Sequence, residues 1–167
     1  LNKYVDNFVI VESIYNHKGE KRELKFNPKK FENFKDKIIY LIYDEIPSEV
    51  ESISDNELEN EKSGKLIMNA LHRESGQRNF IINGLKNANS EDIILISDVD
   101  EIPNLENIIF DKIKKKIIFF NQDMLYYKFN LKLPNLTWTG TRGCKKKYLK
   151  SPQWIRNVKD RKYPFYR

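Results

Sequence analysis

The chain has 167 residues, 40% of them hydrophobic and 32% charged, and a formal net charge of +6. This length and composition are typical of one soluble globular domain, and no apolar run reaches the roughly 18–20 residues that a membrane span needs. The single cysteine, Cys144, excludes an internal disulfide and a cysteine-based zinc site, and no signal peptide is recognisable, so the compartment stays open between the cytoplasm and the secretory-pathway lumen.

Three short apolar runs predict strands at residues 8–11, 38–43 and 93–96. None of them alternates with polar residues, which favours central, mostly parallel strands covered by helices. Residues 93–96 in particular are predicted to form a central strand with helices on both faces. An acidic residue follows each run, in the order Glu12, Asp44 and Asp98. Because ligands of open α/β sheets bind beyond the carboxyl ends of strands, these three carboxylates are candidates to converge.

Between the second and third runs, residues 65–87 carry the best helical pattern, with Gly76 as a candidate break. Residues 48–61 are acidic and predict a solvated loop or insertion. Further along the chain, residues 117–120 and 124–133 predict an antiparallel pair that turns at residues 121–123. Strand, helix and strand followed by a hairpin indicate a single α/β domain over residues 1–167.

The most informative segment is residues 97–103, which read Ser-Asp-Val-Asp-Glu-Ile-Pro. Asp98 and Asp100 are two positions apart, so at the end of an extended strand their side chains would project to one side. Two carboxylates there suit Mg²⁺ or Mn²⁺, with diphosphate oxygens and water completing the shell. The alternative interpretation is an ordinary polar turn, because the tripeptide Asp-x-Asp is common by itself.

Several segments resemble one known family. They are residues 5–13 (VDNFVIVES) and 34–39 (FKDKII), residues 77–79 (QRN) followed by Gly84 and Leu85, residues 92–103 (DIILISDVDEIP), and residues 138–142 (WTGTR). In this order they resemble glycosyltransferase family 17, which includes the β-1,4-mannosyl-glycoprotein β-1,4-N-acetylglucosaminyltransferase. The resemblance covers about residues 4–143, and its central segment is the most specific.

The resemblance implies a GT-A-like (Rossmann-like) α/β fold with a mixed, mostly parallel sheet flanked by helices. It also implies Mn²⁺ or Mg²⁺ and inverting transfer of a sugar from a UDP donor, typically UDP-GlcNAc, to a hydroxyl of a glycan or glycoprotein acceptor. Family members usually carry a strand before the first segment and a Gly-Trp-His segment after the last. Neither is matched here, so a compact or truncated version of the family is expected.

Three further residues are candidates for donor binding. Glu12 would orient the nucleotide or cap its strand. Arg78 shares a helix face with Ile81, Ile82 and Leu85, so it needs an anionic partner such as Asp98, Asp100 or a donor phosphate, unless it is a solvated helix arginine. Arg142 would neutralise the leaving diphosphate or lie on the surface.

An inverting transfer also needs a general base, for which Glu101 and Asp123 are both candidates. The catalytic candidates are therefore Asp98, Asp100 and Glu101, with Asp98 and Asp100 as the metal ligands. Trp138, Tyr126 and Tyr127 offer stacking surfaces to a sugar or base, although aromatic residues in a hairpin favour a core role.

Charge is unevenly distributed. Ten Lys and Arg residues with only Asp160 against them give residues 142–167 a net charge of +9, while residues 44–61 hold eight acids and no base. A basic segment can bind nucleic acid, but the strongest motif is acidic and no nucleic-acid motif is present. We rank that interpretation below a glycosyltransferase and below a non-catalytic module that binds a nucleotide sugar or glycan.

Overall fold

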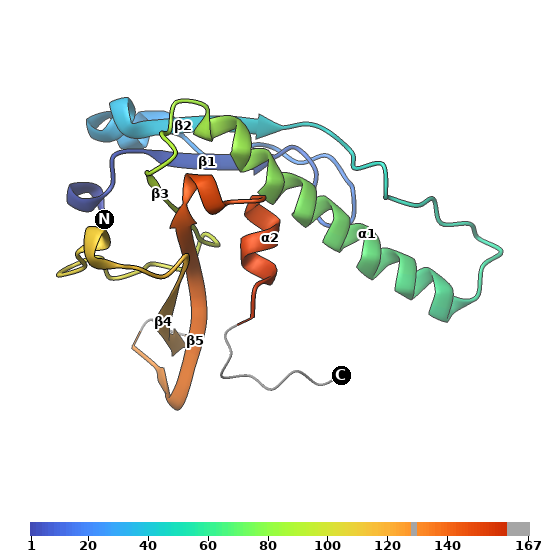
Figure 1. Ribbon diagram of the computed structural model, residues 1–167. Coiled ribbons are helices and arrows are strands. Elements are labelled where there is room, and N and C mark those ends of the chain that lie inside the picture. Colours follow the sequence, from blue (N-terminus) through green and yellow to red (C-terminus); the bar gives the residue numbers. More distant parts are fainter. Residues whose placement is uncertain (128–129, 160–167) are drawn as a thin grey trace. The chain divides into compact units, whose positions relative to one another are not determined.

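The computed structural model describes residues 1–127 and 130–159. The chain divides into two compact units: an N-terminal unit of residues 2–87, and a C-terminal unit made of Leu1 and the chain from Ala88 onward. Figure 1 labels the helices and strands of both units. A single domain over residues 1–167 stays a prediction.

In the N-terminal unit, β1 (Phe8–Ser13) and β2 (Ile38–Tyr43) form a two-stranded parallel sheet. The strands predicted at residues 8–11 and 38–43 are confirmed, and β1 is two residues longer than predicted. Ser13 lies opposite Tyr43, so both strands end at the same edge of the sheet. Two 3-10 helices complete the first half of this unit: η1 (Asn2–Tyr4) and η2 (Pro28–Lys37).

The long helix α1 (Glu59–Asn79) begins six residues before the predicted start and is followed by the 3-10 helix η3 (Phe80–Leu85). It passes through Gly76 without a break. A side chain at position 76 would collide with the Tyr43 hydroxyl and lie 3.0 Å from Pro47, so glycine allows this close packing. Of the acidic loop predicted at residues 48–61, residues 48–58 are confirmed, and residues 59–61 belong to the helix.

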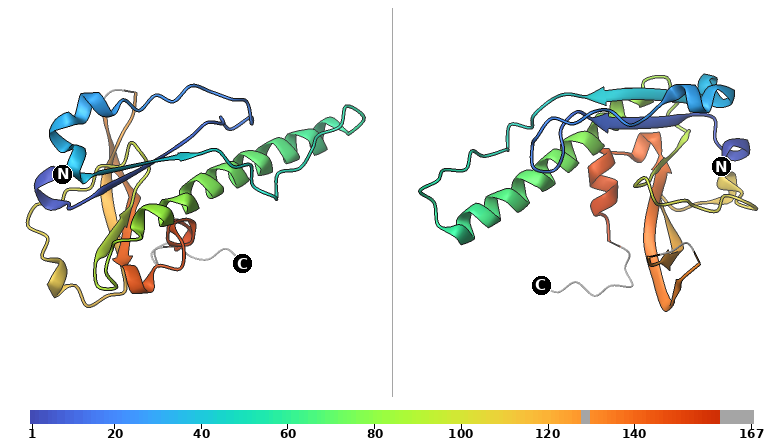
Figure 2. Two further views of the ribbon diagram at one scale, coloured as in Figure 1. Left: turned by 90° about the horizontal axis from the view of Figure 1, so that it is seen from above. Right: turned by 180° about the vertical axis from the view of Figure 1, so that it is seen from behind.

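The C-terminal end of α1 packs on the strands of its unit, where Gln77 donates to the Val11 carbonyl. Figure 2 shows the first half extending beyond the strands, and there Lys65 pairs with Glu57 of the acidic loop at 2.8 Å. Leu66 and Leu71, which belong to the predicted apolar stripe, are 49% and 48% exposed. Further along, the Phe80 ring lies 5.3 Å from the Tyr43 ring and Leu85 is buried.

In the C-terminal unit, β3 (Ile93–Ile96), β4 (Ile117–Leu125) and β5 (Lys132–Lys145) form an antiparallel sheet in the order β3-β5-β4. The strand at residues 93–96 is confirmed, but its predicted central position is wrong, because β3 is an edge strand of this sheet. The middle position belongs to β5, whose many polar residues hid it from a search for apolar runs. The described strands thus make a mixed α/β fold, and a mostly parallel sheet is not found among them.

A hairpin exists and its first predicted strand, residues 117–120, is confirmed, but the turn was placed too early. Of the predicted second strand, 124–133, only residues 132–133 lie in β5. Residues 121–123 continue β4, where Gln122 lies opposite Trp138. The connection to β5 comes after Leu125, and there the Tyr126 N–H donates to the Leu131 carbonyl at 2.9 Å. Asn121 and Asp123 are polar enough to suggest a turn, yet both point outward from an edge strand and are exposed.

The short helix α2 (Pro152–Asn157) packs against β3 and β5. Ser151 caps it by accepting a hydrogen bond from the Trp154 N–H at 3.1 Å, and proline follows at the first helical position. Ile155 of α2 and Cys144 and Thr141 of β5 are completely buried, so the core of this unit lies between the helix and the sheet. The remaining elements are the 3-10 helices η4 (Phe110–Lys112) and η5 (Lys146–Tyr148).

None of the helices within residues 1–127 and 130–159 has both the length and the apolar character needed to cross a membrane.

Candidate active site

Asp98 and Asp100 lie on a tight turn and not on an extended strand. β3 ends at Ile96, and the Glu101 N–H donates to the Asp98 carbonyl at 3.0 Å, which closes a four-residue turn. Val99 is fully exposed and Asp100 is exposed at the tip of this turn. The extended geometry from which we predicted their common direction is wrong, and a turn is the conformation that the alternative interpretation gave these residues.

Glu101 is buried beneath this turn, with 9% of its surface exposed. Its Oε2 accepts a hydrogen bond from the Asp98 N–H at 3.0 Å, and its Oε1 accepts one from the indole N–H of Trp138 at 2.8 Å. A single carboxylate thus ties the turn after β3 to strand β5.

Arg156 of α2 completes the arrangement, and its side chain is only 8% exposed. Its Nη1 and Nη2 bind Glu101 at 2.7 and 2.9 Å, which is the bidentate geometry that favours an arginine–carboxylate pair. Nη2 also donates to Asp98 Oδ2 at 2.8 Å, and Nη1 to the Gly140 carbonyl at 2.7 Å. Arg156 is the functional candidate that sequence reasoning missed. The Ser151–Pro152 pair could have predicted a helix here, but not its partners.

The segment of residues 138–142 lies beside the turn because β5 pairs with β3, with Arg142 opposite Ile96. The Thr141 hydroxyl is 2.7 Å from the Ser97 hydroxyl. At Gly140 a side chain would overlap Gln122, whose Oε1 accepts the Thr141 N–H at 3.0 Å. Residues 92–103 and residues 138–142, which are two separate family-like segments in the sequence, are therefore neighbours in the structure.

Arg142 itself is half-buried in the middle of the sheet. Its guanidinium lies 6.0 Å from the centre of the Phe119 ring, and Nη2 is 3.5 Å from the Thr139 carbonyl. Asp123, the other candidate base, lies on β4 and pairs with Lys132 at 2.7 Å, with 59% of its side chain exposed.

Two carboxylates on the turn fit a divalent cation that shares its ligands with a substrate. Among the described residues, no group of three or more His, Cys, Asp or Glu side chains could hold a metal ion. Asp98 and Asp100 therefore do not form an all-protein metal site. Mg²⁺ commonly uses one or two carboxylates and completes its shell with water and substrate phosphates, and this donor set matches that pattern.

In the N-terminal unit, Glu12 is buried at the end of β1 and organises the chain around it. Its oxygens accept hydrogen bonds from the N–H groups of Lys25 (2.7 Å) and Phe26 (3.0 Å) and from the Tyr40 hydroxyl (2.9 Å), and Arg22 lies 3.6 Å away. Burial alone would raise the pKa of Glu12, but these donors together lower it below its ordinary value. Asp44, at the end of β2, is exposed.

A polar cavity of about 250 Å³ opens at the carboxyl end of β1, where Ser13 lines it. Arg22, Arg73 and Glu74 also line this cavity, so its lining carries two positive charges and one negative charge. Gln77 borders the cavity and donates to the Val11 carbonyl at 2.9 Å. None of these lining residues was singled out individually from the sequence, although Gln77 belongs to a family-like segment.

Arg78 has the anionic partner that its half-buried position requires, and that partner is Glu74. Its Nη2 lies 2.5 Å from Glu74 Oε1, one turn earlier on α1, and 13% of the arginine side chain is exposed. The requirement for a partner was predicted correctly, but a carboxylate on the same helix was not considered. Pairing with Asp98, Asp100 or a donor phosphate stays a prediction, as does convergence of Glu12 and Asp44 with Asp98.

The aromatic residues of the hairpin are not core residues, contrary to the interpretation favoured from sequence. Trp138 is 48% exposed, Tyr126 49% and Tyr127 89%. The two tyrosine rings contact each other edge to face at 4.3 Å. Their exposure follows from their place at the loop end of the two-stranded part of the sheet.

Comparison with protein families gives a match to Glycosyltransferase family 17 over residues 1–159. The match extends beyond the family-like segments and includes α2 with Arg156. Neither the comparison with curated proteins nor that with solved structures gives a match.

Proposed function

Because the chain belongs to glycosyltransferase family 17, we propose that the turn Asp98–Glu101 is the metal and donor site of a sugar-transferring enzyme. Family membership makes the protein a glycosyltransferase, which takes a sugar donor and an acceptor. The observation that carries the proposal is the pair of carboxylates on a turn whose base is held by Glu101 and Arg156.

In this proposal Asp98 and Asp100 bind Mn²⁺ or Mg²⁺, and the donor is a UDP sugar, with UDP-GlcNAc the first candidate. The cation would offset the negative charge that develops on the leaving diphosphate. Arg142 of the middle strand lies opposite Ile96, the last residue of β3, and supplies positive charge at that end of β3. A GT-A-like fold, the UDP donor and the inverting outcome rest on family resemblance, while the carboxylate turn rests on the structure.

Glu101 acts, in our proposal, by positioning the turn. Both of its oxygens already accept hydrogen bonds, and its burial keeps it from an acceptor hydroxyl. A general base must reach the proton that it removes. Asp123, the other candidate base, is exposed and satisfies this requirement better than Glu101 does.

The test is calorimetric titration of UDP with and without Mn²⁺. We expect tight binding only with the metal, and a loss of about 10- to 100-fold in Asp98→Asn and Asp100→Asn. Asp100→Asn is the cleaner variant, because Asp98 also binds Arg156. Asp111→Asn, an exposed aspartate in η4 of the same unit, serves as the matched control.

Equal UDP affinity with and without Mn²⁺, or an unchanged Asp100→Asn variant, would contradict the site. Hydrolysis of UDP-GlcNAc, measured beside binding, separates an enzyme from a module that only binds the donor. Metal-dependent UDP binding without any turnover across a panel of nucleotide sugars would favour the binding module.

A further inference from the structure

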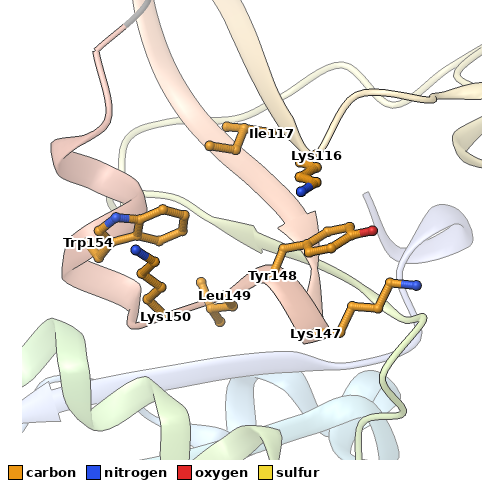
Figure 3. Close-up of a pocket in the computed structure, with 7 residues that line it drawn as sticks. All are labelled: Lys116, Ile117, Lys147, Tyr148, Leu149, Lys150 and Trp154. Atoms are coloured by element: carbon orange, nitrogen blue, oxygen red, sulfur yellow. The ribbon is translucent and has the colours of Figure 1, made fainter.

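A second cavity, of about 370 Å³, lies within the C-terminal unit at the other end of β3 and β5 from the Asp98 turn. Figure 3 shows Trp154 and Tyr148 on two sides of it, with Ile117 and Leu149 between them and lysines at the rim. The lining residues come from the start of β4, from η5 and the turn after it, and from α2. Its volume falls within the range of small-ligand sites and is large enough for a monosaccharide.

The cavity is rich in positive charge, and three lysines line it: Lys116, Lys147 and Lys150. Lys147 pairs with Glu91 at 2.5 Å and shares that carboxylate with Lys145. Lys116 lies 5.2 Å from the centre of the Tyr148 ring and Lys150 lies 5.5 Å from that of Trp154. Within the described part of the chain neither of these two ammonium groups has a carboxylate partner, so both are available to an anion.

The kinds of polar side chain that line the cavity indicate the chemistry of its ligand. No carboxylate or carboxamide side chain lines the cavity. A neutral sugar presents hydroxyl groups that donate as well as accept, and a site for it needs acceptor side chains. Here the side chains offer three ammonium groups, one indole N–H and one phenol, so donors outnumber acceptors and favour a ligand group rich in acceptor oxygens. The half-buried faces of Tyr148 and Trp154 add apolar surface on which the ring of a sugar can pack.

An extended nucleic acid does not fit the same observations. Lys145 and Lys147 both bind Glu91, and Lys146 donates to the Ala88 carbonyl. These three consecutive lysines therefore do not form an open basic strip beside the cavity. Within the cavity lining, the two lysines without a carboxylate partner in the described part of the chain are Lys116 and Lys150.

We infer that this cavity binds a sugar carrying a phosphate or carboxylate group, with Lys116 and Lys150 binding the anion and Tyr148 and Trp154 packing against the ring. The inference concerns a binding site separate from the Asp98 turn, at the opposite end of β3, and it does not rest on the proposed function. Helix α2 links the two sites, because Trp154 lines the cavity and Arg156, two residues later, binds Asp98 and Glu101.

Calorimetric titration with glucose 6-phosphate, glucuronate, methyl glucoside and inorganic phosphate tests the inference. We expect both anionic sugars to bind more tightly than the neutral glucoside and than inorganic phosphate, and binding to weaken as salt is added. In the double variant Lys116→Gln/Lys150→Gln the affinity for the anionic sugars should fall about 10- to 100-fold. Lys115→Gln, an exposed lysine beside Lys116 that does not line the cavity, is the matched control and should bind normally.

Comparing glucose 6-phosphate with glucuronate shows whether the site prefers a phosphate or a carboxylate, and either preference supports the inference. Equal affinity of the double variant and Lys115→Gln, or binding of inorganic phosphate as tight as that of the sugar phosphate, would overturn it. Asp100→Asn separates the two proposals, since it should lose metal-dependent UDP binding and keep the anionic sugar. Conversely, Lys116→Gln/Lys150→Gln should keep UDP binding.

Discussion

Arg156 binds two parts of the chain: Asp98 and Glu101 on the turn after β3, and Gly140 on β5. Two carboxylates lie against one guanidinium, so the positive charge of Arg156 compensates for placing Glu101 in a buried position. Both the charge and the planar shape are used, because Glu101 is bound through two nitrogens. This arrangement makes the turn sensitive to changes in a residue that is not expected to contact the substrate.

We predict that Arg156→Lys keeps the fold and loses about tenfold or more in metal-dependent UDP affinity, because lysine retains the charge without the bidentate fork. Arg156→Ala should also destabilise the protein by about 3–5 kcal/mol, since it leaves a buried carboxylate unpaired. Lys159→Ala, an exposed basic residue just after α2, is the control. Thermal melting and UDP calorimetry measure the two effects, and normal UDP affinity in a folded Arg156→Lys variant would limit Arg156 to a stabilising role.

Arg78 calls for a test that separates donor binding from the bond to Glu74. We predict that Arg78→Ala and Arg78→Lys weaken UDP binding, whereas Glu74→Gln, which removes the negative partner on the same helix, leaves it nearly unchanged. If Glu74→Gln and Arg78→Ala behave alike, or if both bind UDP normally, Arg78 serves only α1. Circular dichroism confirms that each variant is folded.

Sequence reasoning identified the carboxylate turn and could not identify what holds it. Asp98, Asp100 and Glu101 are consecutive or nearly so, and they follow an apolar strand, which is a local signal. Arg156 is 55 residues from Glu101, and nothing in a single sequence links one arginine among many basic residues to that carboxylate. For Glu101 itself, composition alone cannot distinguish an exposed base from a buried ligand of arginine.

At the scale of elements, local sequence signals predicted the strands, whereas contacts between distant segments decide how the strands pair into sheets. All three apolar runs are strands, with bounds close to those predicted, because local hydrophobicity and β-branching decide their conformation. Their partners are decided by contacts between distant segments. β5 pairs with β3 across more than 40 residues, and its polar sequence gave no indication that it would occupy the middle of a sheet.

Two glycines of α1 give a matched pair of substitutions. A side chain at Gly64 would meet nothing within 4 Å, whereas one at Gly76 would meet Tyr43 and Pro47. We predict that Gly64→Ala stabilises the protein by about 0.5–1 kcal/mol through helix propensity. Gly76→Ala should destabilise it by about 1–3 kcal/mol through overpacking, in spite of the same gain in propensity. Denaturant unfolding measures both changes, and opposite signs are the expected result; equal stabilisation would contradict the close packing at Gly76.

At the scale of the whole molecule, acid should weaken both units. The hydrogen bonds from Lys145 and Lys147 lower the pKa of Glu91 in the C-terminal unit from 4.5 to about 2, and the pKa of Glu12 in the N-terminal unit is also lowered. A carboxyl whose pKa is lower in the folded state stabilises that state fully above its unfolded pKa. This contribution is lost as the pH falls through 4.5 towards 2.

We therefore predict that the melting temperature is steady near neutral pH and falls below about pH 4.5. Glu91→Gln should reduce the steepness of that fall. Glu106→Gln, an exposed glutamate of the same unit whose carboxylate makes no ion pair in the described structure, should not. Calorimetric melting across pH 7 to 2 measures the effect, and a melting temperature that rises or stays level below pH 4.5 would contradict the two lowered pKa values.

The held turn at Asp98–Glu101 also has a thermodynamic consequence for ligand binding. Fixing the backbone of one residue costs about 1–2 kcal/mol in conformational entropy at room temperature. If these four residues became ordered only when metal and nucleotide arrived, the entropy loss of about 4–8 kcal/mol would weaken binding by at least about a thousandfold. Glu101 and Arg156 order the turn during folding. The conformational entropy is therefore lost when the protein folds, and it does not reduce the affinity for the ligand. The exposed carboxylate of Asp100 can then bind a cation from a backbone that is already in place.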